Sequence, residues 1–215
     1  MKSLLIWGAG DQGTVALECA LAMNVYESID FLGLKEKERR DIPGYVIYSE
    51  RETVVDELLK AYDEVIVATG DNNLREQKTA LLTSRGIVMP NLIHPTAVVS
   101  PSARIAAGCT VLANAVIHTN ASVGMGCIVN TASIVEHDCV IGDFVNLSPK
   151  TAMAGHTKIG NKSFLGIGCT IIDAITVGKE AVIGAGAVVI RDVPEHAVVS
   201  GVPAKGIRSS KNETE

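Results

Sequence analysis

Residues 121–160 read ASVGMGCIVNTASIVEHDCVIGDFVNLSPKTAMAGHTKIG, and this stretch repeats with a period of six residues. An aliphatic residue returns at every sixth position, from Val123 to Ile159. The same register continues in both directions without an insertion and gives these positions: Ile93, Val99, Ile105, Val111, Ile117, Val123, Val129, Val135, Ile141, Leu147, Met153, Ile159, Leu165, Ile171, Val177, Ile183 and Val189. In a chain that is 47% hydrophobic, a run of this length indicates a repeated structural unit.

A second regularity lies two residues before each aliphatic position, where the side chain is mostly small. Four of the five cysteines occupy this position, so packing explains them better than catalysis does. Two inward residues separated by one outward residue make a very short strand, and the next three residues make a turn. The small positions are Ala97, Ala103, Cys109, Ala115, Ala121, Cys127, Ser133, Cys139, Thr151, Thr157, Ser163, Cys169, Ala181 and Ala187, with Val145 and Ile175 as larger exceptions.

Glycine marks a third regularity, because Gly124, Gly142, Gly160 and Gly178 recur every eighteen residues. Eighteen residues are three repeats, so one coil is expected to be a triangle with glycine at the same corner. We expect a positive φ angle at these glycines. The pattern predicts a parallel β-helix over residues 91–206, followed by a polar tail over 207–215. The period does not reveal the hand of the helix.

The first ninety residues show a different pattern, in which short apolar runs alternate with helical segments. We expect a small Rossmann-like α/β domain over residues 1–90, with strands over 3–7, 28–32 and 64–68 and helices over 14–23, 49–60 and 72–86. Ser49 and Glu52 form a capping-box pattern for the second helix, and Gly86 is a candidate C-cap for the third. The charged run at 35–41, KEKERRD, is expected to be a solvated loop.

Composition excludes several functional classes. The net charge of −5 provides no basic field for nucleic acid, and no apolar run is long enough for membrane insertion. The five cysteines show no C-x-x-C spacing, so neither a zinc knuckle nor a disulfide framework is supported. Without a recognisable leader at its start, the chain is expected to be a soluble cytoplasmic protein.

The chain resembles the hexapeptide-repeat acyltransferases, and within them the sialic-acid O-acetyltransferase and bacillosamine-type N-acetyltransferase family. The matching stretches are GAGDQG at 8–13, ATGDNNLR at 68–75, NTASIVEHDCVIG at 130–142 and GVPAK at 201–205. The resemblance implies a left-handed parallel β-helix and a homotrimer with acetyl-CoA bound between neighbouring β-helices. It also implies that the Rossmann-like domain binds a nucleotide-sugar.

The resemblance also assigns roles to individual residues. His137 corresponds to the general base and Asp138 to the acidic residue that follows it, while Asn130 lies near the acceptor sugar. The implied nucleotide-sugar pocket contains Gly10, Asp11, Gln12 and Gly70. The implied acetyl-CoA site contains Asn146, Ile167 and Ala185.

Several positions depart from the family pattern. The first loop usually reads Gly-Gly-His-Gly, but here it contains Asp11 and Gln12. The acidic pair expected after the second strand is replaced by Gly33 and Leu34. A second histidine of the family is Asn146, and a glycine in the CoA contact is Ala185. These departures leave the fold unaffected and leave the identity of the substrate open.

The residues themselves support acid–base chemistry at His137. A thioester is attacked by a neutral nucleophile, and histidine accepts a proton near neutral pH. His137 lies in the turn after Val135, where its ring can leave the β-helix, and Asp138 or Glu136 could fix its tautomer. The alternative is a surface histidine on a solvated corner.

Two further histidines, His118 and His156, lie nineteen residues on either side of His137. An intersubunit zinc site is conceivable. We expect no metal, because zinc-binding β-helix enzymes also have a close histidine pair and these histidines are far apart in the sequence. His118 is instead expected to line the acceptor pocket.

The Gly8-x-Gly10-x-x-Gly13 pattern after a strand has the form of a dinucleotide fingerprint. An NAD site needs an acidic residue at the end of the second strand, where Gly33 and Leu34 stand. A nucleotide diphosphate at the start of the helix fits better, and a tight turn without a ligand is the competing interpretation.

With the resemblance, these residues predict an acetyl-CoA-dependent N-acetyltransferase that acts on a nucleotide-activated amino sugar, specifically a UDP-linked 4-amino-dideoxysugar, in glycan or exopolysaccharide synthesis. His137 is the expected general base, with direct transfer from acetyl-CoA. One alternative is O-acetylation of a sialic-acid-like sugar. The other is a trimeric β-helix scaffold without catalytic activity.

Overall fold

The computed structural model describes residues 2–34 and 42–209, so the charged run at 35–41 lies outside the described residues. The chain divides into two compact units, Met1–Pro95 and Thr96–Glu215. No helix among the described residues is both long and apolar enough to cross a membrane.

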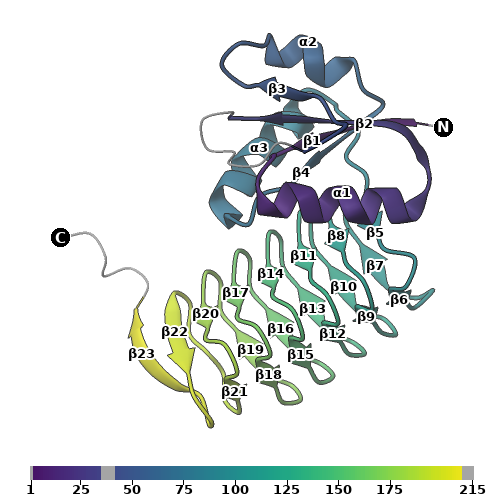
Figure 1. Ribbon diagram of the computed structural model, residues 1–215. Helices are drawn as coiled ribbons and strands as arrows, with labels where there is room; N and C mark the ends of the chain where they lie inside the picture. The colour runs from purple at the N-terminus through teal and green to yellow at the C-terminus, as the bar shows by residue number, and fades with distance from the viewer. Residues whose placement is uncertain (1, 35–41, 210–215) are drawn as a thin grey trace. The chain divides into compact units, whose positions relative to one another are not determined.

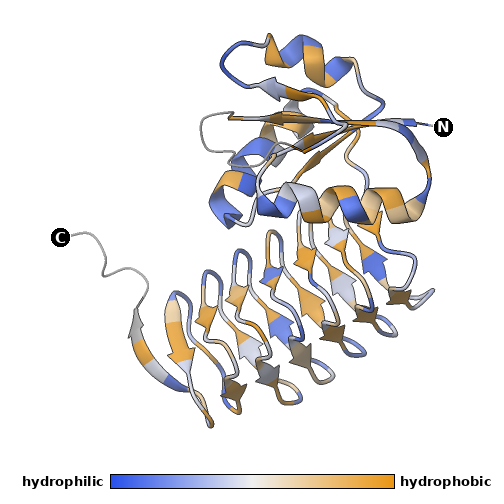
Figure 2. Ribbon diagram, viewed as in Figure 1, coloured by the Kyte–Doolittle hydropathy of each residue, from blue (hydrophilic) through white to orange (hydrophobic). Residues whose placement is uncertain are grey.

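The N-terminal unit is a parallel α/β structure (Figure 1). Its four-stranded sheet has the order β3-β2-β1-β4, and all of its strand pairs are parallel. Buried aliphatic and aromatic side chains from both strands and helices form its core, and Figure 2 shows the apolar central strands. Its elements are β1 (Lys2–Trp7), α1 (Asp11–Met23), β2 (Tyr26–Gly33), β3 (Ile47–Ser49), α2 (Val55–Lys60), β4 (Glu64–Val67) and α3 (Asn72–Ser84).

Two features of this unit differ from the sequence prediction. Helix α1 begins at Asp11, three residues earlier than expected, with Gly10 as its N-cap. The predicted capping box is wrong, because Ser49 ends strand β3 and helix α2 begins only at Val55 after the N-cap Val54. Strand β3 pairs with β2, so the edge of the sheet takes Ser49, the residue at which the sequence pattern placed the start of a helix.

From β5 to β21 the chain forms two-residue strands, and the second residue of each is one of the seventeen predicted aliphatic positions; β22 and β23 are longer. The strands are β5 (Leu92–Ile93), β6 (Val98–Val99), β7 (Arg104–Ile105), β8 (Thr110–Val111), β9 (Val116–Ile117), β10 (Ser122–Val123), β11 (Ile128–Val129), β12 (Ile134–Val135), β13 (Val140–Ile141), β14 (Asn146–Leu147), β15 (Ala152–Met153), β16 (Lys158–Ile159), β17 (Phe164–Leu165), β18 (Thr170–Ile171), β19 (Thr176–Val177), β20 (Val182–Ile183), β21 (Val188–Val189), β22 (Ala197–Ser200) and β23 (Lys205–Ser209).

These strands form three sheets that wrap around one core, with parallel pairing from β6 to β22, which confirms the predicted β-helix (Figure 1). One sheet has the order β19-β16-β13-β10-β7 and a second has the order β21-β18-β15-β12-β9-β6. The third runs β23-β22-β20-β17-β14-β11-β8 within this unit. Paired residues such as Ser122 and Val140 are one coil apart in the sequence, and each coil contributes one strand to each sheet.

The glycines that recur every eighteen residues do not have the positive φ angle that we expected. The left-handed residue of each turn falls two positions later than Gly124 and its equivalents, and it recurs every six residues from Gly108 to Gly186. Gly124, Gly142, Gly160 and Gly178 instead lie where successive coils touch. A Cβ atom on Gly160 would lie 2.4 Å from the backbone nitrogen of Lys179. These glycines are therefore required by close approach rather than by a positive φ angle.

The small inward residues also satisfy backbone groups inside the β-helix. Cys127 Sγ donates to the carbonyl oxygen of Gly142 at 3.0 Å, and Ser133 Oγ donates to that of Ser148 at 3.0 Å. All five cysteines are buried and none forms a disulfide among the described residues, which agrees with the packing interpretation of the four in the β-helix. Burial raises the pKa of Cys139 to about 11, so this thiol stays protonated at neutral pH and is a poor nucleophile.

At the C-terminal end, β23 runs antiparallel to β22 and closes the described part of the β-helix. Residues 207–209 therefore belong to a strand, although the sequence analysis places them in the polar tail. The rest of that tail lies outside the described residues.

Candidate functional site

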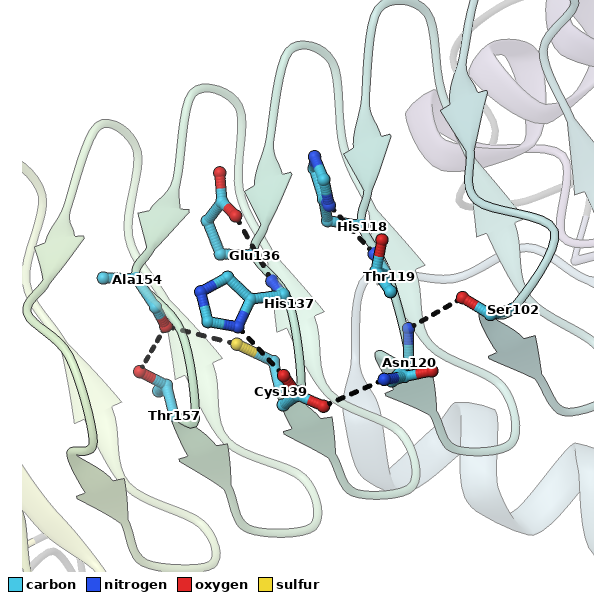
Figure 3. Close-up of polar contacts among 10 residues, drawn as sticks. Ser102, His118, Thr119, Asn120, Glu136, His137, Cys139, Ala154 and Thr157 are labelled. Atoms are coloured by element: carbon cyan, nitrogen blue, oxygen red, sulfur yellow. Dashed lines mark hydrogen bonds and ion pairs between the residues drawn. The ribbon is translucent and has the colours of Figure 1, made fainter.

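Three successive turns of the β-helix place the central histidines on the same corner. Each turn follows a strand of the six-stranded sheet: His118 follows β9, His137 follows β12 and His156 follows β15. Equivalent positions on neighbouring coils are eighteen residues apart, whereas the histidines are nineteen residues apart. Each histidine therefore lies one position further along its turn than the histidine of the preceding coil. Figure 3 shows His118 and His137 on adjacent coils.

His137 is held by a short chain of hydrogen bonds that runs to the preceding coil. His137 Nδ1 lies 2.9 Å from Asp138 Oδ2, and Asn120 Nδ2 donates to Asp138 Oδ1 at 3.2 Å. The Asp138 backbone N–H donates to the Thr119 carbonyl at 2.9 Å. The carboxylate thereby holds the proton on Nδ1 and leaves the Nε2 lone pair available. Of the two carboxylates proposed from the sequence, Asp138 makes this contact; Glu136 accepts instead from the His137 backbone N–H at 3.2 Å.

The imidazole of His137 lies over Gly155 of the next coil. A Cβ atom on Gly155 would lie 2.5 Å from Cε1 and 2.7 Å from Nε2 of His137. The absence of a side chain at this position therefore creates the space in which the ring lies. The sequence analysis did not identify Gly155, and its place one coil after His137 is the signal that could have identified it.

The electrostatics of this corner favour a basic imidazole. The hydrogen bond that Asp138 accepts from the ring raises the pKa of His137, and the negative charges of Asp138, Glu136 and Asp173 add to this effect. The same hydrogen bond, together with the one from Asn120, lowers the pKa of Asp138. Asp138 therefore stays ionised at neutral pH, and His137 accepts a proton more readily than an isolated histidine.

His137 and His156 form a closer pair than their sequence separation suggests. Their ring centroids are 5.1 Å apart with an interplanar angle of 85°. The distance between these histidines in the sequence is therefore no argument against zinc for this pair, because the fold brings the two rings together. Ligand atoms of His137, Asp138 and His156 lie within 4.8 Å of one another, so the corner could hold a metal ion.

Neither the predicted acetyl-CoA residues, Asn146, Ile167 and Ala185, nor the predicted acceptor-site residue Asn130 join this corner within one chain. Asn130, Ile167 and Ala185 lie in turns that precede the six-stranded sheet, whereas His137 lies in a turn that follows it. Ile167 is 54% exposed, and Asn146 is buried on the outer side of β14. The structure therefore separates these residues into a second corner and one sheet face.

The nucleotide residues predicted from the sequence line one pocket of about 450 Å³ in the N-terminal unit. Gly10, Asp11, Gln12 and Gly70 all lie on its wall. Gln12 Nε2 is buried and has no hydrogen-bond partner in the part of the chain that the structure describes. On the opposite loop, the buried Arg75 donates to the Thr69 carbonyl at 2.9 Å and fixes the backbone around Gly70.

The glycines of the first loop have different roles. Gly8 has φ +136°, and a Cβ there would lie 2.2 Å from the Ala68 carbonyl oxygen. A Cβ on Gly13 would lie 1.9 Å from the Gly8 carbonyl oxygen. Gly10 has no atom within 4 Å of this position and faces the pocket. The outer glycines close the turn, and the middle one allows a ligand to approach the backbone.

A cluster of three side chains at this pocket was missed in the sequence analysis. Trp7 Nε1 donates to Glu50 Oε1 at 2.9 Å, and Lys78 Nζ donates to the same oxygen at 2.7 Å. Lys78 Nζ also lies 4.7 Å from the centroid of the Trp7 ring. Glu50 and Lys78 both line the pocket. Glu50 was overlooked because the segment that contains it was assigned to a helix.

Comparisons with known proteins identify relatives of both units. Residues 3–81 match the PglD N-terminal domain, and residues 156–191 match the bacterial transferase hexapeptide (six repeats). A histidine-to-asparagine variant of perosamine N-acetyltransferase from Caulobacter crescentus, solved with CoA and GDP-perosamine, is 32% identical. The match covers 96% of this chain and 97% of that chain with a TM-score of 0.89.

Two further relatives agree with this match. The acetyltransferase domain of PglB from Neisseria gonorrhoeae, solved with acetyl coenzyme A, is 37% identical over 95% of this chain and 98% of that chain, with a TM-score of 0.87. GDP-perosamine N-acetyltransferase of Escherichia coli O157:H7 is 28% identical over 80% of this chain and 79% of its own length. The chain spans only 27% and 37% of the length of serine acetyltransferases from Arabidopsis thaliana and Bacillus pumilus.

Proposed function

This chain belongs to the hexapeptide-repeat N-acetyltransferases that include the GDP-perosamine enzymes, and we propose that it acetylates the amino group of a nucleotide-activated sugar with acetyl-CoA. The relatives solved with CoA, acetyl-CoA and GDP-perosamine support both substrates. The single observation of this chain that carries the proposal is the His137–Asp138 contact at 2.9 Å, because it leaves Nε2 of an exposed imidazole free to act as a base.

His137 is proposed as the general base of a direct transfer. The amino nitrogen of the sugar attacks the carbonyl carbon of the thioester, and the proton that the nitrogen loses moves to His137 Nε2. The C–S bond of the tetrahedral intermediate then breaks, and the CoA thiolate takes the proton back from the imidazolium. Asp138 stabilises the imidazolium in between. No acyl-enzyme is required, and the buried, protonated Cys139 next to Asp138 is unsuited to forming one.

A homotrimer is proposed because one chain separates the two parts of the site. A neighbouring copy would bring its Ile167 and Ala185 corner to the His137 corner of the first copy. The six-stranded sheet, which lies between these two corners, has an outer column that is apolar except for Thr170 and is suited to such contacts. This column consists of Val98, Val116, Ile134, Ala152, Thr170 and Val188, whereas the five-stranded sheet has Arg104, Ser122, Val140, Lys158 and Thr176 at the same positions.

The pocket of the N-terminal unit is proposed to bind the nucleotide. Its volume of about 450 Å³ is in the range of small-ligand sites, and Gly10 lets a diphosphate approach the start of helix α1. The sequence predicts a UDP-linked 4-amino sugar, whereas the perosamine relatives are named for a GDP-linked sugar. Both nucleotides belong in the test of function.

The test measures thiol release from acetyl-CoA in the presence of UDP- and GDP-linked 4-amino sugars and their 4-hydroxy counterparts. We expect turnover with at least one amino sugar and none with its hydroxyl counterpart. Turnover confined to hydroxyl sugars would establish an O-acetyltransferase instead. Folded protein that releases no thiol with any sugar would support the scaffold alternative and contradict the proposal.

A further inference from the structure

One wall of the N-terminal pocket carries a fixed acceptor beside a fixed donor. The Glu50 carboxylate follows strand β3, and Lys78 projects from helix α3. Their side chains are 21% and 14% exposed, and they contact each other at 2.7 Å. Trp7 fixes the pair from the end of β1 through its N–H bond to Glu50 and through its ring under Lys78. Neither group is free to turn away from the pocket without breaking these contacts.

The bonding leaves one oxygen of Glu50 for a ligand. A carboxylate oxygen has about two lone-pair sites, and the N–H groups of Trp7 and Lys78 occupy both sites of Oε1. Oε2 has no hydrogen-bond partner among residues 2–34 and 42–209. Lys78 has three N–H donors and uses one on Glu50. The pair therefore presents an acceptor and a donor side by side.

We propose that Glu50 and Lys78 select the nucleobase, accepting bases that carry an N–H group next to a C=O group. Guanine offers N1–H beside O6, and uracil and thymine offer N3–H beside O4. In each case the base N–H donates to Glu50 Oε2, and the base carbonyl accepts from Lys78 Nζ. Adenine and cytosine carry a ring acceptor beside an amino donor, the reverse order along the base edge. With the base held in the same orientation by its ribose and diphosphate, the ring acceptor faces the carboxylate and the amino group faces the ammonium. This inference rests on the proposed nucleotide-sugar substrate.

The bonding pattern favours the base over the other parts of a nucleotide. A carboxylate binds the two hydroxyl groups of a ribose best when both of its oxygens can accept a hydrogen bond. Glu50 Oε1 already accepts two hydrogen bonds from the protein, so Glu50 is less suited to the ribose. A phosphate is repelled by the Glu50 charge and finds open backbone at Gly10, on a different segment of the pocket wall.

A mismatched base leaves partly buried polar groups unpaired. Because the pair is partly exposed, water replaces some of the lost bonds, and we expect discrimination of about 10- to 100-fold. This is smaller than the discrimination of fully buried sites and is measurable in a binding titration.

The experiment titrates GDP, UDP, ADP and CDP into the full chain and follows the fluorescence of Trp7, the only tryptophan of the chain. We expect GDP or UDP to bind about 10- to 100-fold more tightly than ADP and CDP. Glu50→Gln turns the acceptor into an amide that donates, so the preference should shrink or reverse. Glu57→Gln makes the same change on an exposed residue of α2 outside the pocket and should leave the four affinities unchanged.

Equal affinity for all four diphosphates, or binding of none of them, would overturn the inference. A base preference that is unchanged in Glu50→Gln would also overturn the inference. If in that case 2′-deoxy-GDP binds the wild type more weakly than GDP does, Glu50 would be assigned to the ribose. If Glu50→Gln does not fold, Lys78→Met tests the donor and should weaken GDP and UDP more than ADP and CDP. Base selection without acetyl transfer to any sugar would contradict the proposed function and leave this inference standing.

Discussion

The β-helix and the N-terminal unit separate stability from function to different degrees. In the β-helix, inward positions such as Val135 and Leu147 repeat every six residues and form the core, while His137 lies on an exposed corner. In the N-terminal unit, Trp7 belongs to the buried core and also holds Glu50 at the pocket. A repeated core leaves its corners free to carry chemistry, whereas a small α/β core shares residues with its site.

The largest effect that tests this separation is expected for His137→Ala. Loss of a general base lowers kcat about 100- to 10,000-fold. The side chain is 47% exposed, so the melting temperature should stay unchanged. Steady-state kinetics and thermal unfolding measure the two quantities. His196→Ala, a histidine that pairs with Glu180 on another corner, is the control and should keep its activity. A clear loss of stability in His137→Ala would break the comparison.

The second effect concerns the repeated core. Leu147 is fully buried, so Leu147→Ala should lower the free energy of unfolding by about 2–5 kcal/mol. Val140→Ala, at an outward position that is 47% exposed, should cost less than about 1 kcal/mol. Chemical denaturation measures both variants. Equal losses would show that the inward and outward positions do not differ as the six-residue period predicts.

The third effect tests the coupling in the N-terminal unit. Trp7→Phe keeps an aromatic ring but removes the N–H donor to Glu50, and a hydrogen bond to a charged group contributes about 1.5–3 kcal/mol. Unlike His137→Ala, this variant should lose both stability and affinity for nucleoside diphosphates. Calorimetry follows unfolding and binding in the same samples. If only stability or only affinity changed, the core and the pocket of this unit would not depend on the same residue, and the N-terminal unit would resemble the β-helix in this respect.

The smallest effect is expected at the start of helix α3. Asp71 Oδ1 accepts from the backbone N–H groups of Asn73 and Leu74 at 2.9 and 3.0 Å. Asp71→Ala should therefore lower the free energy of unfolding by about 1 kcal/mol. Asp71→Asn retains an acceptor and should cost less, as urea unfolding curves of the two variants can show. Equal losses in both would indicate that the negative charge matters more than the cap.

The sequence predicted the β-helix closely because each coil obeys the same packing rule. An aliphatic residue points inward every six residues, so position alone assigns the strands from β5 to β21. The corner glycines were recognised for the wrong reason, because contact between coils is invisible in a single coil. Gly155 was missed for the same cause: its role depends on His137 in the preceding coil.

The N-terminal unit was predicted less completely because its elements do not repeat. Ser49 and Glu52 have the spacing of a capping box, yet pairing with β2 makes the preceding residues a strand. This error hid Glu50, whose importance depends on Trp7 and Lys78, 43 and 28 residues away in the chain. Local patterns detect helices and strands, whereas contacts between distant segments require the fold.

The most direct test of the central claim is the pH dependence of kcat in the wild type and in Asp138→Asn. The Asp138 hydrogen bond raises the pKa of His137, and a general base works only when unprotonated, so activity should fall as the pH drops through that pKa. Asparagine tolerates the positive φ of residue 138 but carries no charge. The imidazolium loses stabilisation in the variant, so the acid limb should move to lower pH while the maximal rate falls. An acid limb that stays at the same pH in Asp138→Asn would contradict His137 as the base that Asp138 activates.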